Sequence, residues 1–504
     1  MAGGYLVLES PNVGVVLATN KRFYCTVEAV DPAVPLDPDH KNDAIMTEIV
    51  VKSPQFHSEW SYTFTATKDV DDTTPSQYYY NTTTLTPSTS NETVNGFVEK
   101  TLRLTLSYIL DSLTTTTTVQ QQQQQQVLPT NLQITIRADN DFYSVIPHLQ
   151  ERNLPATPES VDSLPSFLPC PRDTTTNKTI VHKTGLGSSA ALVTSCVGAL
   201  LHFFGLAQQD AVYNLSQICH CHAQGKVGSG FDVSAAVHGS HVYRRFPKHT
   251  LTDLLERLEE TTAIVVVEEE NSSSSSTKTT RMLLKDLVES KWEGGVVCPL
   301  GLPEGLELLL ADVCGGSESP SMARKVLAWK ASRENPTEES YWEQLRDLNQ
   351  QIVDMLTKDD NTNVDVDLYS PTTCQEWKGS SHDDTNDNET TTSIVVRLEK
   401  ALKESRTLLK AMGVSAGVPV EPDEQTALAN ATQELPGVVA ALVPGAGGYD
   451  ALACLYVNDK QGTVKKRIGE LWAGWTQGGA TVCPLAVKAG SYGEGLVVEQ
   501  DFAL

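Results

Sequence analysis

The chain has 504 residues, enough for two or three domains that each bury a core. Its net charge of −25 argues against nucleic acid or an anionic membrane as the main partner, because both attract clustered Lys and Arg. No apolar run reaches the ~20 residues of a membrane span, and the start lacks a basic segment followed by an apolar one. We therefore expect a cytoplasmic protein, with its ten cysteines as reduced thiols.

Strand-like and helical patterns follow one another without a regular repeat. Strands are predicted at 14–18, 131–137 and 180–182, and a largely buried helix over 189–204 is expected to end at Gly205. A buried strand over 306–312 is followed by helices over 321–332, 341–357 and 394–412 and by a strand, turn and helix around 439–453. The pattern predicts an α+β fold with domains at 1–255 and 290–504.

Several polar, low-complexity stretches interrupt this pattern. They lie near 71–95, 114–126, 272–276 and 358–392 and are rich in Thr, Gln, Ser, Asn or Asp. Such compositions do not build a core, so we predict surface loops.

Cys219, His220, Cys221 and His222 form a short cluster that resembles part of a metal site. Tetrahedral zinc sites usually combine two pairs of Cys or His ligands from different parts of a chain, and the sequence has no second pair to complete such a site. The end of a helix near a loop is the favoured interpretation.

The segment from Ile180 to Leu192 places glycines and serines between a β-branched run and a good helix former. Gly185 and Gly187 allow a positive φ and a close approach to a ligand, and the helix that follows directs N–H groups into the loop. This arrangement predicts a phosphate-binding loop. Ser188 and Ser189 are candidate helix caps, and one of these hydroxyls is a candidate Mg²⁺ ligand. A plain glycine-rich turn is the structural alternative.

A second glycine-rich segment, around Gly228 and Gly230, carries a lone carboxylate at Asp232. Phosphoryl transfer needs an in-line acceptor, neutralised charge and a group that takes or orients the acceptor proton. Asp232 is the candidate base, and Lys226 is a candidate source of positive charge. The alternative is that Asp232 caps the next helix.

A third glycine-rich turn is built from Gly445, Ala446, Gly447 and Gly448 and precedes a run predicted to be helical. Together the three segments resemble the motifs of the GHMP kinase superfamily. Four further strings, which begin at Ser53, Asp139, Gly239 and Gly316, resemble the eukaryotic (fungal and plant) phosphomevalonate kinases.

The resemblance implies a GHMP kinase fold, with a ribosomal S5 domain 2-like N-terminal domain and a ferredoxin-like C-terminal domain. It also implies Mg²⁺ as cofactor and the transfer of phosphate from ATP to 5-phosphomevalonate. The implied ATP-binding residues are Lys183, Thr184, Gly185, Leu186, Gly187, Ser188, Ser189 and Ala190, with Ser189 at the metal. The implied catalytic and acceptor-site residues are Asp232, Lys226, Tyr5, Ser229, Gly230, Ser317, Ser319, Ser321, Arg324, Gly445, Ala446, Gly447 and Gly448.

The string around Ser317 places small hydroxyl residues before a helix that carries Arg324 and Lys325. Hydroxyl, N–H and guanidinium donors suit an acceptor that already carries a phosphate. An exposed basic helix face is the alternative. Another GHMP enzyme, such as mevalonate kinase or diphosphomevalonate decarboxylase, and a catalytically silent GHMP-fold regulator stay open as alternative functions. A monomer or homodimer is expected.

The family resemblance begins at Ala2. Family members carry a strand with Pro-Gly-Lys ahead of this point, and the lysine is associated with the active site. The resemblance therefore predicts that the true start lies further upstream; the alternative is that the protein has lost activity.

Overall fold

The fold is described from a computed structural model. It describes residues 2–31, 44–67, 82–88, 94–115, 128–260, 264–265, 280–313, 319–332, 337–357, 394–449, 451–459, 461–477 and 481–499. The predicted inserts at 272–276 and 358–392, and most of the one at 114–126, lie outside these residues.

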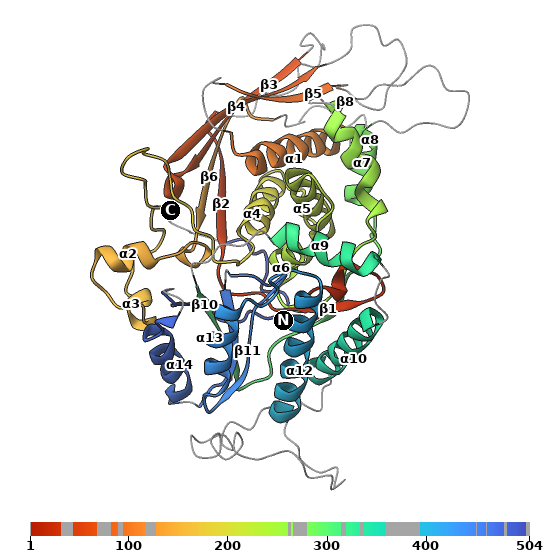
Figure 1. Cartoon of the computed structure of the whole chain (residues 1–504). Helices are drawn as coiled ribbons and strands as arrows, with labels where there is room; N and C mark the ends of the chain where they lie inside the picture. The colour runs from red at the N-terminus through yellow and green to blue at the C-terminus, as the bar shows by residue number, and fades with distance from the viewer. Residues whose placement is uncertain are drawn as a thin grey trace.

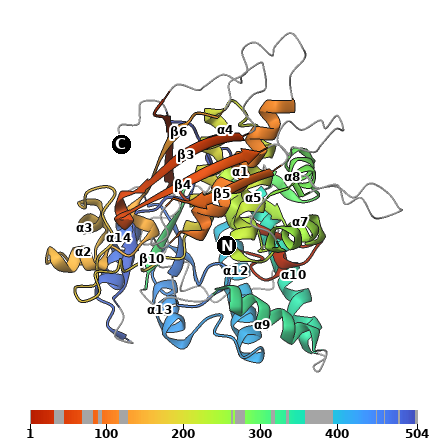
Figure 2. The ribbon, with the colours of Figure 1, turned by 90° about the horizontal axis from the view of Figure 1, so that it is seen from above.

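A six-stranded sheet forms one layer of the molecule (Figures 1 and 2). Its strand order is β2-β6-β3-β4-β5-β8, and the β3–β6 pair is parallel while the other pairs are antiparallel. The strands are β2 Phe23–Ala29, β3 Ala44–Ser53, β4 Ser58–Thr67, β5 Thr82–Pro87, β6 Asn131–Ala138 and β8 Ile264–Val265. Along β6 every second residue is buried, which shows that one face of the sheet packs on the core.

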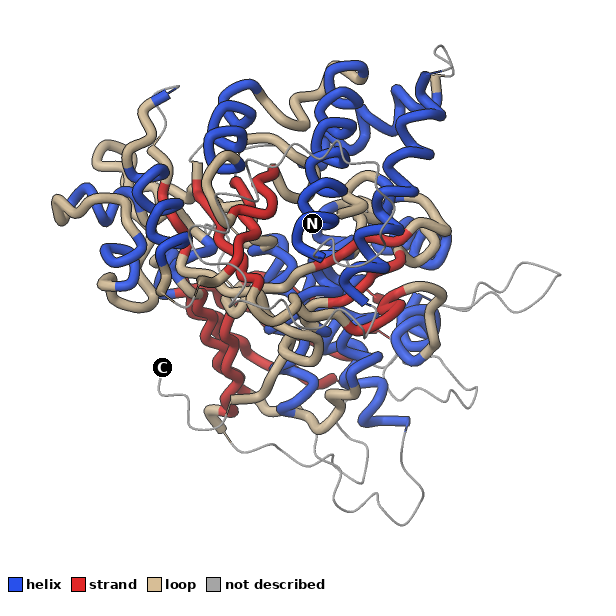
Figure 3. The backbone as a smooth tube through the Cα atoms, turned by 90° about the horizontal axis from the view of Figure 1, so that it is seen from below, coloured by secondary structure: helices blue, strands red, loops and turns tan. Residues whose placement is uncertain are grey.

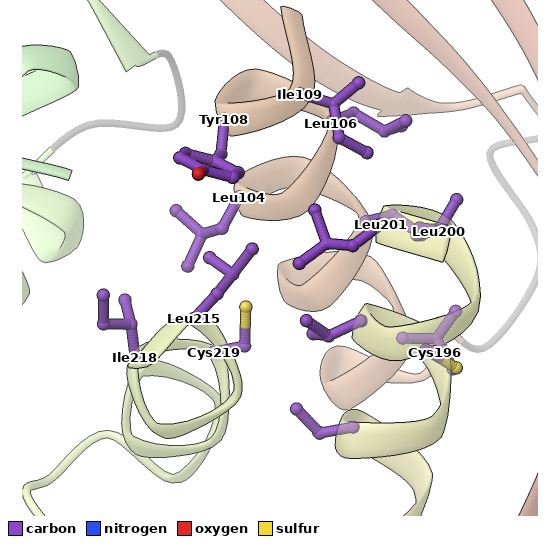
Figure 4. Packing of buried hydrophobic residues seen from close by; sticks show 14 of the residues in the cluster. Leu104, Leu106, Tyr108, Ile109, Cys196, Leu200, Leu201, Leu215, Ile218 and Cys219 are labelled. Carbon is purple, nitrogen blue, oxygen red and sulfur yellow. The ribbon is translucent and has the colours of Figure 1, made fainter. Parts of the chain in front are cut away.

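Helices α1 Gly96–Thr115 and α4 Ser188–Phe203 cover that face, and α5 Gln209–Gln224 packs on both of them. Leu104 of α1, Leu201 of α4 and Leu215 of α5 are fully buried and point toward one another (Figure 4). Helix α4 ends at Phe203, two residues before the predicted stop at Gly205, whose φ is +73°. The helix predicted over 189–204 is therefore confirmed.

Two predictions in this half are wrong. Residues 82–87, expected to belong to a loop insert, form β5 and pair with β4, because alternate residues Thr83 and Leu85 are buried and threonine is β-branched. Residues 180–182, expected to form a strand, make no ladder; only isolated bridges flank them, at Thr179 and Lys183. The backbone of Ile180 donates to Pro171 and that of His182 accepts from Ser144, but these single hydrogen bonds to two different segments do not extend into a ladder.

A three-stranded sheet of β1 Val13–Val16, β7 His241–Arg244 and β9 Gly295–Pro299 lies next to the second half of the chain. The second half contains an antiparallel sheet of order β11-β12-β10-β13. Its strands are β10 Leu306–Asp312, β11 Val438–Leu442, β12 Ala451–Val457 and β13 Cys483–Leu485.

Helices cover both faces of this second sheet (Figures 1 and 3). One face packs on α10 Thr337–Thr357 and α12 Ile394–Ser415, and the other on α13 Asp423–Gln433 and α14 Thr463–Ala473. All seven residues of β12 are consequently buried. The helix predicted after the third glycine turn is thus wrong: a continuous apolar run suits a strand that is covered on both faces.

The remaining described helices are short or lie around the periphery (Figure 1). They are η1 Leu6–Leu8, η2 Pro54–Phe56, η4 Asn140–Phe142, α2 Ile146–Glu151, α3 Pro158–Asp162, α6 Phe231–His238, α7 His249–Glu260, α8 Thr280–Glu289 and α9 Ser319–Ala331.

Candidate active site

The first glycine loop leads into α4 through Gly187, which precedes the helix with a φ of +71°. Gly185 also has a positive φ, of +78°. Ser188 is the first helical residue, so the predicted capping by Ser188 or Ser189 is wrong: a glycine occupies the cap position, and no side chain caps the helix. The first-turn N–H groups are therefore left without a side-chain acceptor at the point where the helix dipole favours an anion.

Thr184 fixes the loop to the preceding part of the chain. Its buried hydroxyl donates to the carbonyl of Asp141 at 2.5 Å, and its backbone N–H donates to the carbonyl of Phe142 at 3.3 Å. The carboxylate of Asp141 lies 2.9 Å from the ammonium of Lys21. The position of the loop is thus set by contacts outside its own sequence.

The second glycine loop is held from below by α5 and β7. Gln217 donates from Nε2 to the carbonyl of Gly230 at 2.8 Å, and the hydroxyl of Tyr243 donates to the carbonyl of Ser229 at 2.9 Å. A Cβ added at Gly230 would lie 2.8 Å from that hydroxyl oxygen and 2.9 Å from Oε1 of Gln217. The guanidinium of Arg245 also donates to the carbonyl of Val227 at 2.8 Å. A glycine is therefore required at 230.

Asp232 lies in the first turn of α6 and faces the first loop. A Cβ built on Gly187 would be 3.5 Å from the Cβ of Asp232. Oδ1 accepts the backbone N–H of Val233 at 3.0 Å, whereas Oδ2 lies 3.9 Å from Nε2 of His220. The carboxylate is a quarter exposed, so it meets both the protein and the open space above the loop.

Lys183, Lys226 and Arg324 border the same cavity as this carboxylate. Burial lowers the pKa of the Lys226 ammonium, and the nearby guanidinium of Arg324 lowers it further. Burial also lowers the pKa of His220; Asp232 opposes this shift, while Lys183 and Lys226 reinforce it. An anion placed between Lys226 and Arg324 would relieve their mutual repulsion.

The third glycine loop packs against the start of the chain. The hydroxyl of Tyr5 donates to the carbonyl of Ala446 at 2.6 Å, and burial raises the pKa of this phenol. Gly447 has a φ of +87°, and an added Cβ would lie 2.0 Å from the carbonyl oxygen of Val420. The N–H of Gly448 donates to the same carbonyl at 3.1 Å.

All three loops border one large cavity of about 2170 Å³. The predicted site residues on its wall are Tyr5, Lys183, Thr184, Gly185, Leu186, Gly187, Ser188, Ser189, Lys226, Ser229, Gly230, Asp232, Arg324, Gly445, Ala446 and Gly447. Ala190 instead faces the core below the sheet, and Gly448 lies behind the wall. Ser317 lies outside the described residues, as do the side chains of Ser319 and Ser321.

Several cavity residues escaped the analysis of the sequence. Arg245 lies in the segment that begins at Gly239, whose sequence indicates a family resemblance but no role for this arginine. Its structural role is a contact to the second glycine loop, which is distant in sequence. Arg406 donates from Nε and Nη2 to both carboxylate oxygens of Glu421, each at 2.8 Å, and thereby ties α12 to the segment that carries Val420. No local sequence pattern predicts the ion pair between Arg406 and Glu421.

The cluster of Cys and His residues belongs to the last turns of α5, as the favoured interpretation had it. Its members face different neighbours: His220 lies 3.1 Å from the hydroxyl of Ser189, and Nε2 of His222 lies 2.7 Å from the guanidinium of Arg103. In the part of the chain that the structure describes, no group of three or more His, Cys, Asp or Glu side chains is placed to hold a metal ion.

None of the helices within the described ranges combines the length and the apolar character needed to cross a membrane.

Comparison with known proteins identifies the class first. The family model of the GHMP kinases N terminal domain matches residues 156–240, which contain the first two glycine loops. The crystal structure of the Lin0012 protein from Listeria innocua superposes with a TM-score of 0.56 at 15% identity, covering 97% of this chain and 94% of that one. The fold is therefore that of a GHMP kinase, and the predicted α+β fold is confirmed.

Two curated relatives narrow the class. The peroxisomal phosphomevalonate kinase of Arabidopsis thaliana is 32% identical over 91% of this chain and 88% of its own length. The phosphomevalonate kinase of Candida albicans is 33% identical over 93% of this chain and 89% of its own. The chain belongs to the phosphomevalonate kinase family.

Proposed function

We propose that the chain transfers the γ-phosphoryl group of ATP to the phosphate of 5-phosphomevalonate, giving ADP and 5-diphosphomevalonate, a step of the mevalonate route to isoprenoids. One observation carries the proposal: Asp232 lies against Gly187 at the start of α4, while Lys226 and Arg324 border the same cavity. The names of the Arabidopsis and Candida relatives support it.

Asp232, Lys226 and Arg324 have different roles in the proposed phosphoryl transfer. An oxygen of the acceptor phosphate attacks the γ-phosphorus, and the bond from that phosphorus to the oxygen shared with the β-phosphate breaks. A phosphate monoester has its second pKa near 6, so near neutral pH most of the acceptor is already a dianion. Asp232 then orients the acceptor and takes the proton of the monoanionic fraction. Lys226 and Arg324 offset the repulsion between two polyanions.

Mg²⁺ fits the donors present. Magnesium keeps several waters and is held in nucleotide sites by one or two protein oxygens together with phosphates. The hydroxyl of Ser189 borders the cavity and would hold such an ion together with phosphate oxygens and water. When bound, it supplies positive charge to the phosphate oxygens. ATP as the nucleotide and Mg²⁺ as the cofactor are parts of the proposal.

The division into domains at 1–255 and 290–504 is also proposed, on the ground that each half contains its own sheet and core. A cytoplasmic location and a monomeric or homodimeric state are proposed from the sequence alone. The Arabidopsis relative carries the word peroxisomal in its name, which makes localisation a separate experiment.

The test is phosphate transfer by the purified chain with ATP and Mg²⁺, followed by ADP release and by ³¹P NMR of the product. The expected result is a diphosphate signal with 5-phosphomevalonate and no ADP release with mevalonate. Activity on mevalonate alone would make the protein a mevalonate kinase, and carbon dioxide release from 5-diphosphomevalonate would make it a decarboxylase. Ligand binding without turnover on any acceptor would indicate a silent regulator.

A further inference from the structure

His220 brings together three groups of the active site. It lies in α5 one turn before the helix ends at Gly225, and only 3% of its side chain is exposed. Its Nε2 lies 3.1 Å from the hydroxyl of Ser189, 3.2 Å from the amide nitrogen of Gln224 and 3.9 Å from the carboxylate of Asp232. A single ring nitrogen therefore stands between the loop hydroxyl and the candidate base.

The surroundings determine which role this nitrogen plays. The amide nitrogen of Gln224 lies 3.2 Å from Nε2 and can only donate, so Nε2 is an acceptor and the ring proton is on Nδ1. The hydroxyl of Ser189, 3.1 Å away, shares the single lone pair of this nitrogen with the amide N–H. The separation of 3.9 Å from Asp232 is too long for a hydrogen bond. The carboxylate thus stays available to the cavity.

A neutral acceptor at this place also orients Ser189. If the hydroxyl donates its proton to Nε2, the lone pairs of the oxygen point away from His220. Ser189 borders the cavity, so those lone pairs are directed toward a bound metal ion or a hydrogen-bond donor there. Without His220, the hydroxyl is free to rotate and to donate its proton to a phosphate, which removes the oxygen from the metal.

We propose that His220 is a positioning residue for phosphoryl transfer: it holds the hydroxyl of Ser189 by accepting its proton at Nε2 while leaving the carboxylate of Asp232 unpaired by the ring. The proposal rests on the proposed kinase function for its kinetic consequences. The ring contact itself does not depend on that function.

The test uses two substitutions that differ in where they place an amide. His220→Gln sets its amide close to the position of Nε2, and His220→Asn sets it close to Nδ1. Removing such an orienting partner typically costs ~10–100-fold in activity or metal affinity, so we expect a loss of that size in kcat for His220→Asn. We expect His220→Gln to stay within about fivefold of the wild type, and the KM for 5-phosphomevalonate to change little in either variant.

A double-mutant cycle separates positioning from a merely structural role. Because His220 acts through Ser189, adding His220→Asn to Ser189→Ala should cause little further loss of kcat. Losses that multiply would overturn the proposal, as would a kcat of His220→Asn close to that of the wild type. Melting temperatures of all variants report any general loss of stability.

A measurement on the unmodified protein keeps the proposal falsifiable if His220→Asn does not fold. ¹⁵N-histidine NMR near neutral pH, with the signal assigned through His220→Gln, should show a ring protonated at Nδ1 alone. A proton on Nε2 would overturn the proposal. If the wild type turns over no acceptor, the proposed kinase function is wrong. The spectrum would still test whether Nε2 of His220 can accept the hydrogen bond from Ser189.

Discussion

Asp232 lies directly against Gly187, with its Cβ 3.5 Å from the point where a side chain would leave the glycine. The two residues are 45 positions apart and belong to the starts of different helices, α6 and α4. This contact puts a carboxylate beside the helix N-terminus that is best suited to bind phosphate. A group bound at the first glycine loop therefore lies next to the carboxylate of Asp232.

The first prediction concerns this carboxylate. Asp232→Asn should lower kcat substantially while ATP still binds, because the amide keeps the shape and removes the charge and the proton acceptor. General-base contributions are typically ~10²–10⁴-fold, and the low end is expected here since the acceptor is mostly ionised already. Initial rates and nucleotide binding by fluorescence titration measure the two effects. Retention of most of the wild-type rate would remove Asp232 from this role.

The second prediction compares two neighbouring cations on α9. Both residues are exposed, but Arg324 borders the cavity and Lys325, the next residue, does not. Arg324→Gln should raise the KM for 5-phosphomevalonate about tenfold or more, because a charge-assisted contact to phosphate contributes about 1.5–3 kcal/mol. Lys325→Gln is the matched control and should leave it unchanged. Equal effects of the two substitutions would show that general charge, rather than a specific contact, attracts the acceptor.

The third prediction concerns the third glycine loop. Gly447→Ala combines a positive φ with a contact of 2.0 Å to the backbone carbonyl of Val420, so it should destabilise the protein by about 3 kcal/mol or more. Gly462, with a φ of +71° and nothing within 4 Å of an added Cβ, offers the control. Gly462→Ala should cost only the conformational strain, about 1–2 kcal/mol. Chemical denaturation measures both, and similar losses would contradict the close approach.

The fourth prediction concerns the pH dependence of stability. Burial, together with the nearby charges of Lys100 and Arg103, lowers the pKa of His222 from 6.5 to about 3. A histidine with a depressed folded pKa binds fewer protons when folded, so its contribution to stability is intact above pH 6.5 and is lost as pH falls from there toward 3. The slope for one proton is about 1.4 kcal/mol per pH unit.

His222→Gln should therefore flatten the loss of stability on acidification, since glutamine also accepts from the Arg103 guanidinium and does not titrate. His202, which is exposed at the end of α4, provides the control, and His202→Gln should leave the pH profile unchanged. Urea unfolding at a series of pH values gives the profiles. An unaltered profile for His222→Gln would show that the ring is protonated in the folded protein.

Elements with local signals could be predicted from the amino-acid sequence. The buried strand β10, the long helix α4 and the two positive-φ glycines of the first loop were predicted within a residue or two, because apolar periodicity and backbone freedom are encoded in consecutive residues. The fold class also followed, since the order of strands and helices and the three glycine segments are properties of the chain.

Two strands, the cavity and the orientation of His220 depend instead on tertiary packing. Threonine-rich β5 and apolar β12 depend on partner strands and covering helices that local sequence does not specify. The cavity likewise exists only because segments from residue 5 to residue 447 converge on it. His220 shows the reason most clearly: in sequence it belongs to a cluster with Cys219 and His222, but α5 turns it toward Ser189 and Asp232, which come from two other helices. Contacts between distant segments are set by packing, and packing is resolved only when the whole chain has folded.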